Sequence, residues 1–259
     1  MAERSRTLSS KKIRAVAARP LRGKAEPLPV PPAARTIQKE IQQGLDRLVS
    51  GKHDSPLGPD FRKAWRAVTA LIDRYQRLIM EASGVRRSCA EGCASCCFHW
   101  VEDVNSFEAE ILADFLKAHH PGSVRRIVDR CRRDEMRLKQ LLEVVEEKLD
   151  SVKDQPECGR IDSVDLLLAA FYQLRLPCPL LHRGECIAYQ VRPLTCRMYV
   201  SFSDPSRCDP DYINSGDIPT YLFDLEEAAD SLIDKLHFKF LKFENDAGLR
   251  SLLLKYLSE

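Results

Sequence analysis

The stretch CAEGCASCC, residues 89–97, determines how the chain is organised, because it places four cysteines within nine residues beside Gly92. A single cysteine is most often a small buried apolar residue, but four in so short a stretch are hard to explain in that way. Four thiolates around one ion form the tetrahedral site that zinc or iron prefers. Gly92 precedes Cys93, where a sharp turn needs an unusual φ or a close backbone approach. The stretch therefore predicts a metal-binding loop.

A second group of cysteines lies far along the chain, in residues 178–208, and its members are more widely spaced. Metal binding by both groups would tie the two halves of the chain together, so that binding free energy is also folding free energy. Neighbouring Cys96 and Cys97 point in different directions from one backbone, which favours two metal ions or a polynuclear cluster over one mononuclear site. The predicted metal ligands are Cys89, Cys93, Cys96, Cys97, Cys178, Cys186, Cys196 and Cys208.

Two of the ten cysteines fall outside this set. Cys131 lies on the apolar stripe of a predicted helix, so we expect it in the core. Cys158 stands in a loop with proline and glycine and is left open as a ligand or a structural residue. His99 and His182 lie near the two groups and are alternative ligands, because histidine often binds zinc.

Two arginines, Arg192 and Arg197, flank Cys196. Their positive charge would lower the pKa of a nearby thiol and partly offset the negative charge of the thiolates. Bracing of the loop through salt bridges or hydrogen bonds is the alternative interpretation.

The bulk composition fits a globular protein without a strong charge. Of the 259 residues, 44% are hydrophobic and 30% are charged, yet the formal net charge is only +2, which gives no general indication of nucleic acid or an anionic membrane as partner. No stretch approaches the ~20 apolar residues of a membrane span, and no apolar block of a secretory signal is present. We therefore expect a cytoplasmic protein, in which thiols are metal ligands or catalytic groups before they are disulfides.

Residues 1–35 differ from the rest of the chain. They hold nine Lys or Arg and two Asp or Glu, a local charge of 9 − 2 = +7, so the remainder carries 2 − 7 = −5. With five prolines and few bulky apolar residues, they are predicted to form a disordered basic tail. The tail is the one part of the chain suited to nucleic acid; a transit peptide is a weaker alternative. Residues 36–259 are predicted to form a single helical domain, with the cysteine-rich region at about 86–210.

Apolar residues at spacings of three and four predict helices for most of that domain. The predicted helices cover residues 36–49, 60–84, 106–119 and 124–152, an apolar run at 164–174, and two closing helices lined by residues 222–240 and 249–257. Asn105 and Glu108 have capping-box spacing at the start of the third. On the long helix, Cys131, Leu138, Leu142 and Val145 recur at heptad spacing. The predicted fold is mainly α, with an irregular cysteine-rich core and little or no strand.

The cysteine pattern resembles that of the YkgJ-type cysteine-cluster family, which is described as a zinc- or iron-chelating domain. The resemblance covers residues 86–210 and rests on the Cys-Cys ending at Cys97 and on the sequence from Cys178 through Tyr189, Arg192, Pro193 and Cys196 to Cys208. All eight family cysteines have a counterpart here, although three residues stand between Cys89 and Cys93 where many members have two. The resemblance implies metal binding, and an iron–sulfur cluster is one form that it can take.

Enzymatic alternatives also come from this resemblance and from spacing. Some relatives are described as flagellin lysine N-methylases, which implies a protein substrate and S-adenosylmethionine, but the sequence has no Gly-x-Gly for the usual cofactor loop. The spacing Cys89-x3-Cys93-x2-Cys96 is that of radical S-adenosylmethionine enzymes, although Ser95 stands where an aromatic residue is usual. Cys93-x-x-Cys96 also matches a thiol redox motif. The metal-binding interpretation is preferred, with its biological role and any protein partner left open.

Overall fold

The computed structural model describes residues 26–84, 86–89, 92–152, 171–172, 174–202, 208, 221–222, 225–243 and 248–259. Within them the fold is mainly α, as the sequence predicts. The α-helices are α2 (Pro32–Ser50), α3 (Pro59–Ser83), α4 (Ser106–His119), α5 (Pro121–Val152), α7 (Leu194–Met198), α8 (Glu227–Lys239) and α9 (Leu249–Ser258). Two short 3-10 helices are η1 (Ser95–Phe98) and η2 (Tyr189–Val191).

Strands are short wherever the structure describes them. Strand β1 (Glu26–Pro27) pairs in parallel with β4 (Tyr221–Leu222). Strand β2 (Leu181–His182) pairs antiparallel with β3 (Glu185–Cys186) to form a tight hairpin. Each strand has two residues, so these pairs connect segments of the chain and do not form a layer of their own.

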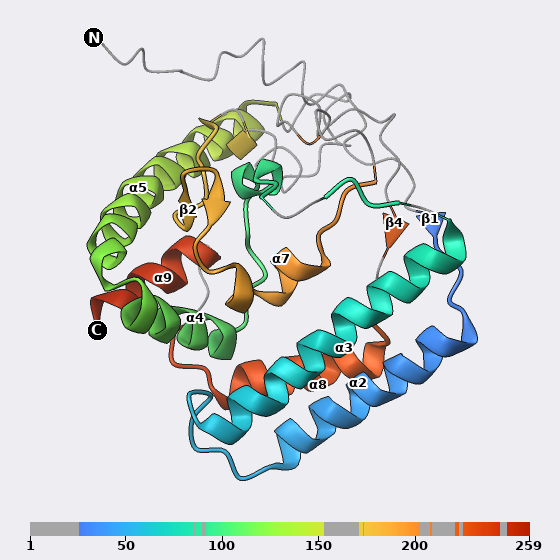
Figure 1. The fold of residues 1–259 in the computed structure, drawn as a ribbon. Helices are drawn as coiled ribbons and strands as arrows, with labels where there is room; N and C mark the ends of the chain where they lie inside the picture. The colour runs from blue at the N-terminus through green and yellow to red at the C-terminus, as the bar shows by residue number, and fades with distance from the viewer. Residues whose placement is uncertain are drawn as a thin grey trace.

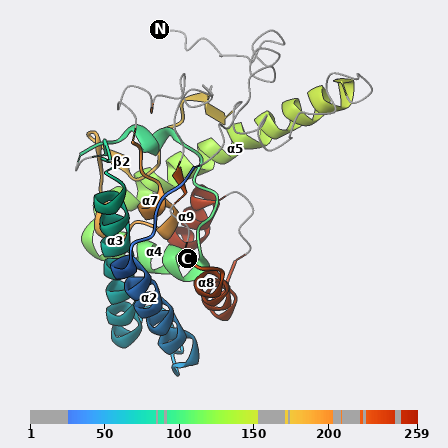
Figure 2. The same ribbon diagram turned by 90° about the vertical axis from the view of Figure 1, so that its right-hand side faces the viewer.

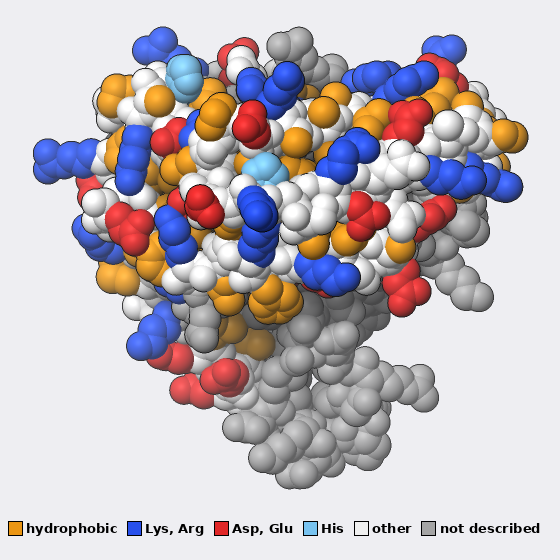
Figure 3. Space-filling model, turned by 90° about the horizontal axis from the view of Figure 1, so that it is seen from below, with side chains coloured by type: hydrophobic (Ala, Val, Ile, Leu, Met, Phe, Trp, Pro, Cys, Tyr) orange, Lys and Arg blue, Asp and Glu red, His pale blue; other side chains and the backbone are white. Residues whose placement is uncertain are grey.

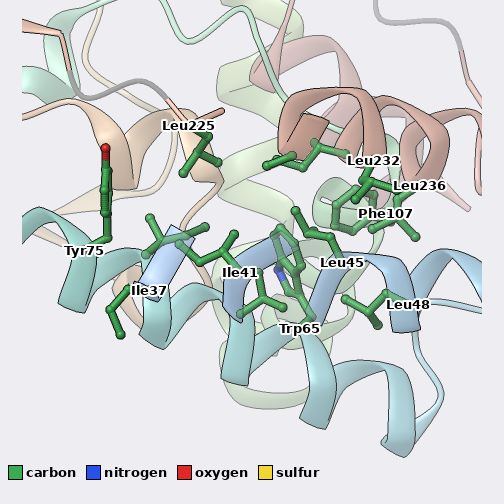
Figure 4. Packing of buried hydrophobic residues seen from close by; sticks show 14 of the residues in the cluster. Ile37, Ile41, Leu45, Leu48, Trp65, Tyr75, Phe107, Leu225, Leu232 and Leu236 are labelled. Carbon is green, nitrogen blue, oxygen red and sulfur yellow. The ribbon is translucent and has the colours of Figure 1, made fainter. Parts of the chain in front are cut away.

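A first helical group consists of α2, α3 and α8, which lie side by side (Figure 1). Its core is a cluster of fully or nearly fully buried apolar side chains, which α4 joins through Phe107 and Ile111. Figure 4 shows Ile41, Leu45 and Trp65 of α2 and α3 lying against Phe107 of α4 and the leucines of α8. Phe61 makes edge-to-face contacts with Phe107 and Phe240, at centroid distances of 5.9 and 5.1 Å.

A second helical group consists of α4, α5 and α9, and it has a separate apolar cluster. Figure 2 shows α5 extending beyond the other helices towards its C-terminal end. There Leu138, Leu141 and Val145 pack against Phe171 and Leu176. Cys131 is fully buried in the second group, which confirms its predicted place in the core.

The predicted stripe on α5 is wrong at Leu142, which is exposed, whereas Leu141 is buried. The buried positions Ile127, Cys131, Asp134, Leu138, Leu141 and Val145 alternate between spacings of four and three residues, which is heptad spacing, so the prediction was wrong in the position of one buried row and not in the period. Between Cys131 and Leu138 the buried residue is Asp134, and a charged partner must compensate for the burial of its carboxylate.

Helix boundaries agree with the prediction at most ends. Helix α4 begins and ends where predicted, and α3 ends at Gly84, whose positive φ of 68° forms a left-handed cap. Helices α2 and α5 begin earlier than predicted, at Pro32 and Pro121, because proline is favoured at the first helical position. The boundary drawn at residue 35 for the basic tail thus falls inside α2.

Several sequence predictions fall on residues outside the described set. These include residues 1–25 of the basic tail, Cys158, and most of the apolar run at 164–174. Helix α8 begins at Glu227, so Leu222 and Leu225 of the predicted closing helix precede it. In the described part of the chain, no helix has the length and apolar character needed to cross a membrane. Figure 3 shows basic and acidic side chains interspersed on one face of the molecule.

The core of the first helical group gives a direct test of the packing. We predict that Phe61→Ala lowers the free energy of unfolding by about 3–5 kcal/mol, because it removes a fully buried aromatic ring and leaves a cavity. The matched control is Phe238→Ala, whose side chain is 70% exposed, with an expected change within about 0.5 kcal/mol. Urea denaturation of both variants measures the difference; equal losses would contradict the packing described here.

Candidate metal centre

The two cysteine segments meet between the two helical groups. The backbone N–H of Cys178 donates a hydrogen bond to the carbonyl of Cys97, with an N–O distance of 2.6 Å. Cys97 lies in η1, whose turn is closed by the bond from Cys97 N–H to the Ala94 carbonyl. Residues from the two cysteine segments are therefore direct neighbours.

The start of the first segment is fixed by the chain that follows α7. Both the backbone N–H and the Oγ of Ser88 donate to the carbonyl of Ser201, at 2.8 and 3.1 Å. The N–H of Ser201 donates in return to the Sγ of Cys89, at 3.2 Å. Gly92 has a φ of 83°, which confirms the predicted sharp turn before Cys93.

The β2–β3 hairpin brings Cys186 back beside Cys178. Its two-residue loop has positive φ at both Arg183 and Gly184, 51° and 86°, as a type I′ turn requires. Leu181 is paired with Cys186 across the hairpin. The sequence prediction treated this region as irregular. The signal that could have identified the hairpin is a glycine at the second loop position between two short apolar stretches.

Helix α7, which carries Cys196, is held by a buried carboxylate that the sequence assigned only to capping. Glu108 of α4 accepts a hydrogen bond from the backbone N–H of Leu194 at 2.7 Å and from the Asn105 side chain at 2.8 Å. It also accepts from the backbone N–H of Asn105, which is one of the two hydrogen bonds of the predicted capping box. Burial raises the pKa of Glu108 to about 6, against the lowering effect of these donors.

A second set of contacts fixes α7 to α3. Arg197 is buried and donates to the carboxylate of Asp73 at 2.6 Å, and Gln76 donates to the Arg197 carbonyl. Arg192 lies 3.8 Å from the same aspartate and stacks over the Tyr189 ring at 4.0 Å. Arg197 thus has the bracing role, whereas the charge of Arg192 also contributes to the lowered pKa of Cys96, after the Cys97 hydrogen bond, and only partly offsets the burial that raises the pKa of Cys186.

Each of the eight predicted ligands lies close enough to another for their charges to interact, and Cys96 has partners in both cysteine segments. Cys96 interacts electrostatically with the thiols of Cys89, Cys97, Cys178, Cys186 and Cys196. Cys93 and Cys208 interact electrostatically with the thiol of Cys89. In the described residues, however, no group of three or more His, Cys, Asp or Glu side chains is drawn close enough to hold a metal ion.

Burial makes most of these thiols difficult to ionise. It raises the pKa of Cys178 to about 11 and that of Cys196 well above its usual value, and neighbouring thiols add to the rise at Cys196. Cys96 and Cys97 form a pair in which the Cys97 thiol donates to Cys96, so the pKa of Cys96 is lowered and that of Cys97 is raised. The arrangement therefore favours one thiolate, at Cys96, among neutral thiols.

The two histidines proposed as alternative ligands occupy different environments. His99 is buried between the rings of Tyr172 and Tyr199, and its Nε2 lies 3.4 Å from the Cys208 carbonyl. Because a carbonyl only accepts, this contact makes Nε2 the donor and uses one of the two possible ligand atoms. Burial lowers the pKa of His99 to about 4. His182 is exposed on the hairpin.

The backbone before Cys178 is anchored by a buried ion pair that sequence reasoning missed. Arg250 of α9 is 2% exposed and donates to Asp134 of α5, 7% exposed, at 3.0 Å. The same guanidinium donates to the carbonyls of Leu176 and Pro177. Arg130 of α5 continues the anchor by donating to the carbonyls of Cys178 and Leu181.

This anchor can be tested by removing one charge at a time. We predict that Arg250→Met lowers the free energy of unfolding by about 3–5 kcal/mol, because it leaves a buried carboxylate and two carbonyls without their donor. The double variant Arg250→Met/Asp134→Leu should recover part of that loss in thermal or urea denaturation. As a control, Arg132→Met breaks a 3.9 Å pair with Asp129 that is 61% and 48% exposed, at a cost below about 1 kcal/mol. A loss in Arg250→Met no larger than the control's would contradict the anchor.

Comparisons with protein-family models, with curated proteins and with solved structures find no match to this chain. The resemblance to the YkgJ-type family therefore rests on the cysteine pattern alone, and it stays a prediction.

Proposed function

We propose that the protein is a cytoplasmic metal-binding protein that holds zinc or iron through cysteine thiolates, an iron–sulfur cluster being one form of the iron. The observation that supports this most strongly is the meeting of the two cysteine segments at the Cys97–Cys178 hydrogen bond. Segments far apart in the sequence contribute four thiols each to one region of the fold. Thiolates of this kind are the donors that both metals take.

A bound cation would change the electrostatics of the region. The thiols are packed where burial and mutual repulsion raise the pKa of most of them. A metal ion inverts that preference, because it deprotonates a coordinating thiol outright. Arg192 and Arg250 contribute positive charge near Cys96 and Cys178, but each of them is already engaged with a carboxylate. The thiolates of a loaded site would therefore depend on the metal for most of their charge compensation.

Metal binding would also stabilise the fold, because the ligands come from both halves of the chain. The helical groups supply contacts of their own to the cysteine segments, through Glu108, Asp73 and Arg250. To bind a metal ion, the thiols would therefore need to move closer together, whereas the helices that hold their backbone are already in place. Binding free energy then adds to folding free energy.

The identity of the metal is tested by elemental analysis and an absorption spectrum of protein purified without oxygen. An iron–sulfur cluster gives a brown protein that absorbs at roughly 400 nm, whereas zinc gives a colourless one. Either result supports the proposal. Protein that contains neither metal, and takes up neither Zn²⁺ nor ferrous iron with sulfide, would contradict it.

Single substitutions test the ligands. We predict that Cys96→Ser and Cys196→Ser each lower the metal content and the melting temperature, because serine does not replace a thiolate ligand. Cys131→Ala is the matched control, since its thiol is buried close to Cys178 but belongs to the core. It should keep its metal and lose only about 1 kcal/mol of stability. A full complement of metal in Cys96→Ser would refute the ligand assignment.

A further inference from the structure

The first turn of α4 is capped by a side chain from another helix. Asn105 occupies the N-cap position, but its side chain makes no capping hydrogen bond. The backbone N–H of Ser106 instead donates to the Nδ1 atom of His237, in α8, at 3.1 Å. The Ser106 Oγ lies 3.3 Å from the same nitrogen. Because the first N–H groups of a helix have no partner within it, His237 satisfies one that would otherwise be buried and unpaired.

This contact determines the protonation state of His237. A backbone N–H can only donate, so Nδ1 must be the unprotonated acceptor of a neutral ring whose hydrogen is on Nε2. Protonation of Nδ1 would remove the acceptor. It would also place a positive charge at the N-terminal end of α4, where the helix dipole is already positive. The cap therefore exists only while His237 is neutral.

The capped turn holds two parts of the fold in place. Phe107, the residue after Ser106, packs edge-to-face against two aromatic rings of α3 and lies next to leucines of α8 (Figure 4). Glu108, the next residue, accepts the backbone N–H of Leu194 at the start of α7. His237 of α8 is thus connected to α7 through one turn of α4.

The groups around His237 have opposing effects on its charge. Asp234, one turn earlier on α8, favours the charged form, and so does the C-terminal end of α8, in whose last turn His237 lies. Burial has the larger effect and lowers the pKa of His237. The hydrogen bond from Ser106 acts in the same direction as burial, because a donor N–H stabilises the neutral ring.

Charged side chains on the elements packed against α8 are already engaged or are exposed. On α4, Glu108 bonds to Leu194, Glu110 pairs with Lys242, and Asp114 pairs with Arg62 of α3. At the end of α2, whose last carbonyls accept from Lys239, the charged side chains are exposed: Asp46 and Arg47. Within the described residues, Asp234 thus supplies the one counter-charge that acts on His237.

We propose that His237 is a proton-sensitive cap: neutral, it fixes the first turn of α4, and protonated, it releases that turn and loosens the hold of Glu108 on α7. The proposal goes beyond metal binding and needs no bound metal, because every contact in it lies within the chain. Since burial lowers the pKa of His237 from its usual 6.5, the unfolded chain takes up this proton more readily than the folded one. The stability that the cap contributes is therefore present above the unfolded value and is lost as the pH falls through it.

The test compares His237→Asn and His237→Leu in the full chain, in reducing buffer at about pH 7.5 and about pH 5.5, on either side of the ordinary histidine pKa. The asparagine oxygen is attached to Cγ, as Nδ1 is, so it can accept from Ser106 and does not titrate. At the higher pH, His237→Leu should lower the melting temperature by about 2–4 °C, the effect of one lost helix cap in a chain of this size, whereas His237→Asn should keep it.

Acidification should lower the melting temperature of the unmodified chain more than that of His237→Asn. His119→Asn, which replaces an exposed histidine in the last turn of α4, should follow the unmodified chain. Hydrogen exchange then locates the effect. At the lower pH, the backbone amides of Ser106 and Leu194 should exchange about fivefold faster in the unmodified chain than in His237→Asn, as the loss of a cap worth about 1 kcal/mol predicts. Faster exchange at Ser106 alone would overturn the link to α7.

A further measurement uses the unmodified chain alone. Long-range ¹H–¹⁵N NMR spectra should show the His237 ring with its hydrogen on Nε2 at the higher pH and with a pKa below 6.5. A hydrogen on Nδ1, or an equal response of the unmodified chain and His237→Asn to acid, would overturn the proposal whatever the metal content. Protein that binds no metal would contradict the proposed function and leave this cap as it is.

Discussion

The contact between Cys97 and Cys178 is the constraint on which the architecture of the cysteine region depends. A 2.6 Å backbone hydrogen bond joins a short 3-10 turn in the first half of the chain to the segment that leads into the β2–β3 hairpin in the second. A backbone bond of this kind is independent of the protonation state of the thiols. It therefore keeps the two sets of side chains adjacent whether or not a cation is present.

The helices stabilise this contact because they fix the backbone on each side of it. In the second helical group, Arg130 and Arg250 hold the carbonyls of Leu176, Pro177, Cys178 and Leu181. Asp73 of α3, in the first group, and Glu108 at the start of α4 hold α7 and with it Cys196. These charged groups are buried because they are paired, as buried charges must be. The two apolar clusters thus form the walls of the region, and a small number of ion pairs and carbonyl contacts determine where its cysteines lie (Figure 1).

Much of the fold could be predicted from sequence because its helices have strong local signals. Helix α4 lies between a capping-box pair and a Pro-Gly sequence, and its boundaries follow from them. Leu142 was misplaced because positions three and four residues after Leu138 both fit a heptad and both carry leucine, so spacing alone does not decide which of the two is buried. Helices α2 and α5 were predicted to begin at residues 36 and 124, after Pro32 and Pro121, although proline is also a favoured first residue of a helix.

The candidate site was less accessible to sequence reasoning. The eight cysteines are the predicted donors, and Gly92 indicated the turn, but nothing local indicated that Arg250 is buried or that Glu108 reaches Leu194. Such partners are set by tertiary packing, since an arginine on an amphipathic helix normally faces solvent. The pairing of thiols across the region is likewise a property of the folded chain.

The most direct test of convergence is X-ray absorption spectroscopy at the metal edge of the loaded protein. A centre built from both cysteine segments predicts a first shell of four sulfur atoms, at about 2.3 Å for zinc. Mixed-segment ligation also predicts that serine at Cys97 or at Cys178 removes one sulfur from the same shell. A first shell of nitrogen and oxygen, or a full sulfur shell after either substitution, would contradict the account.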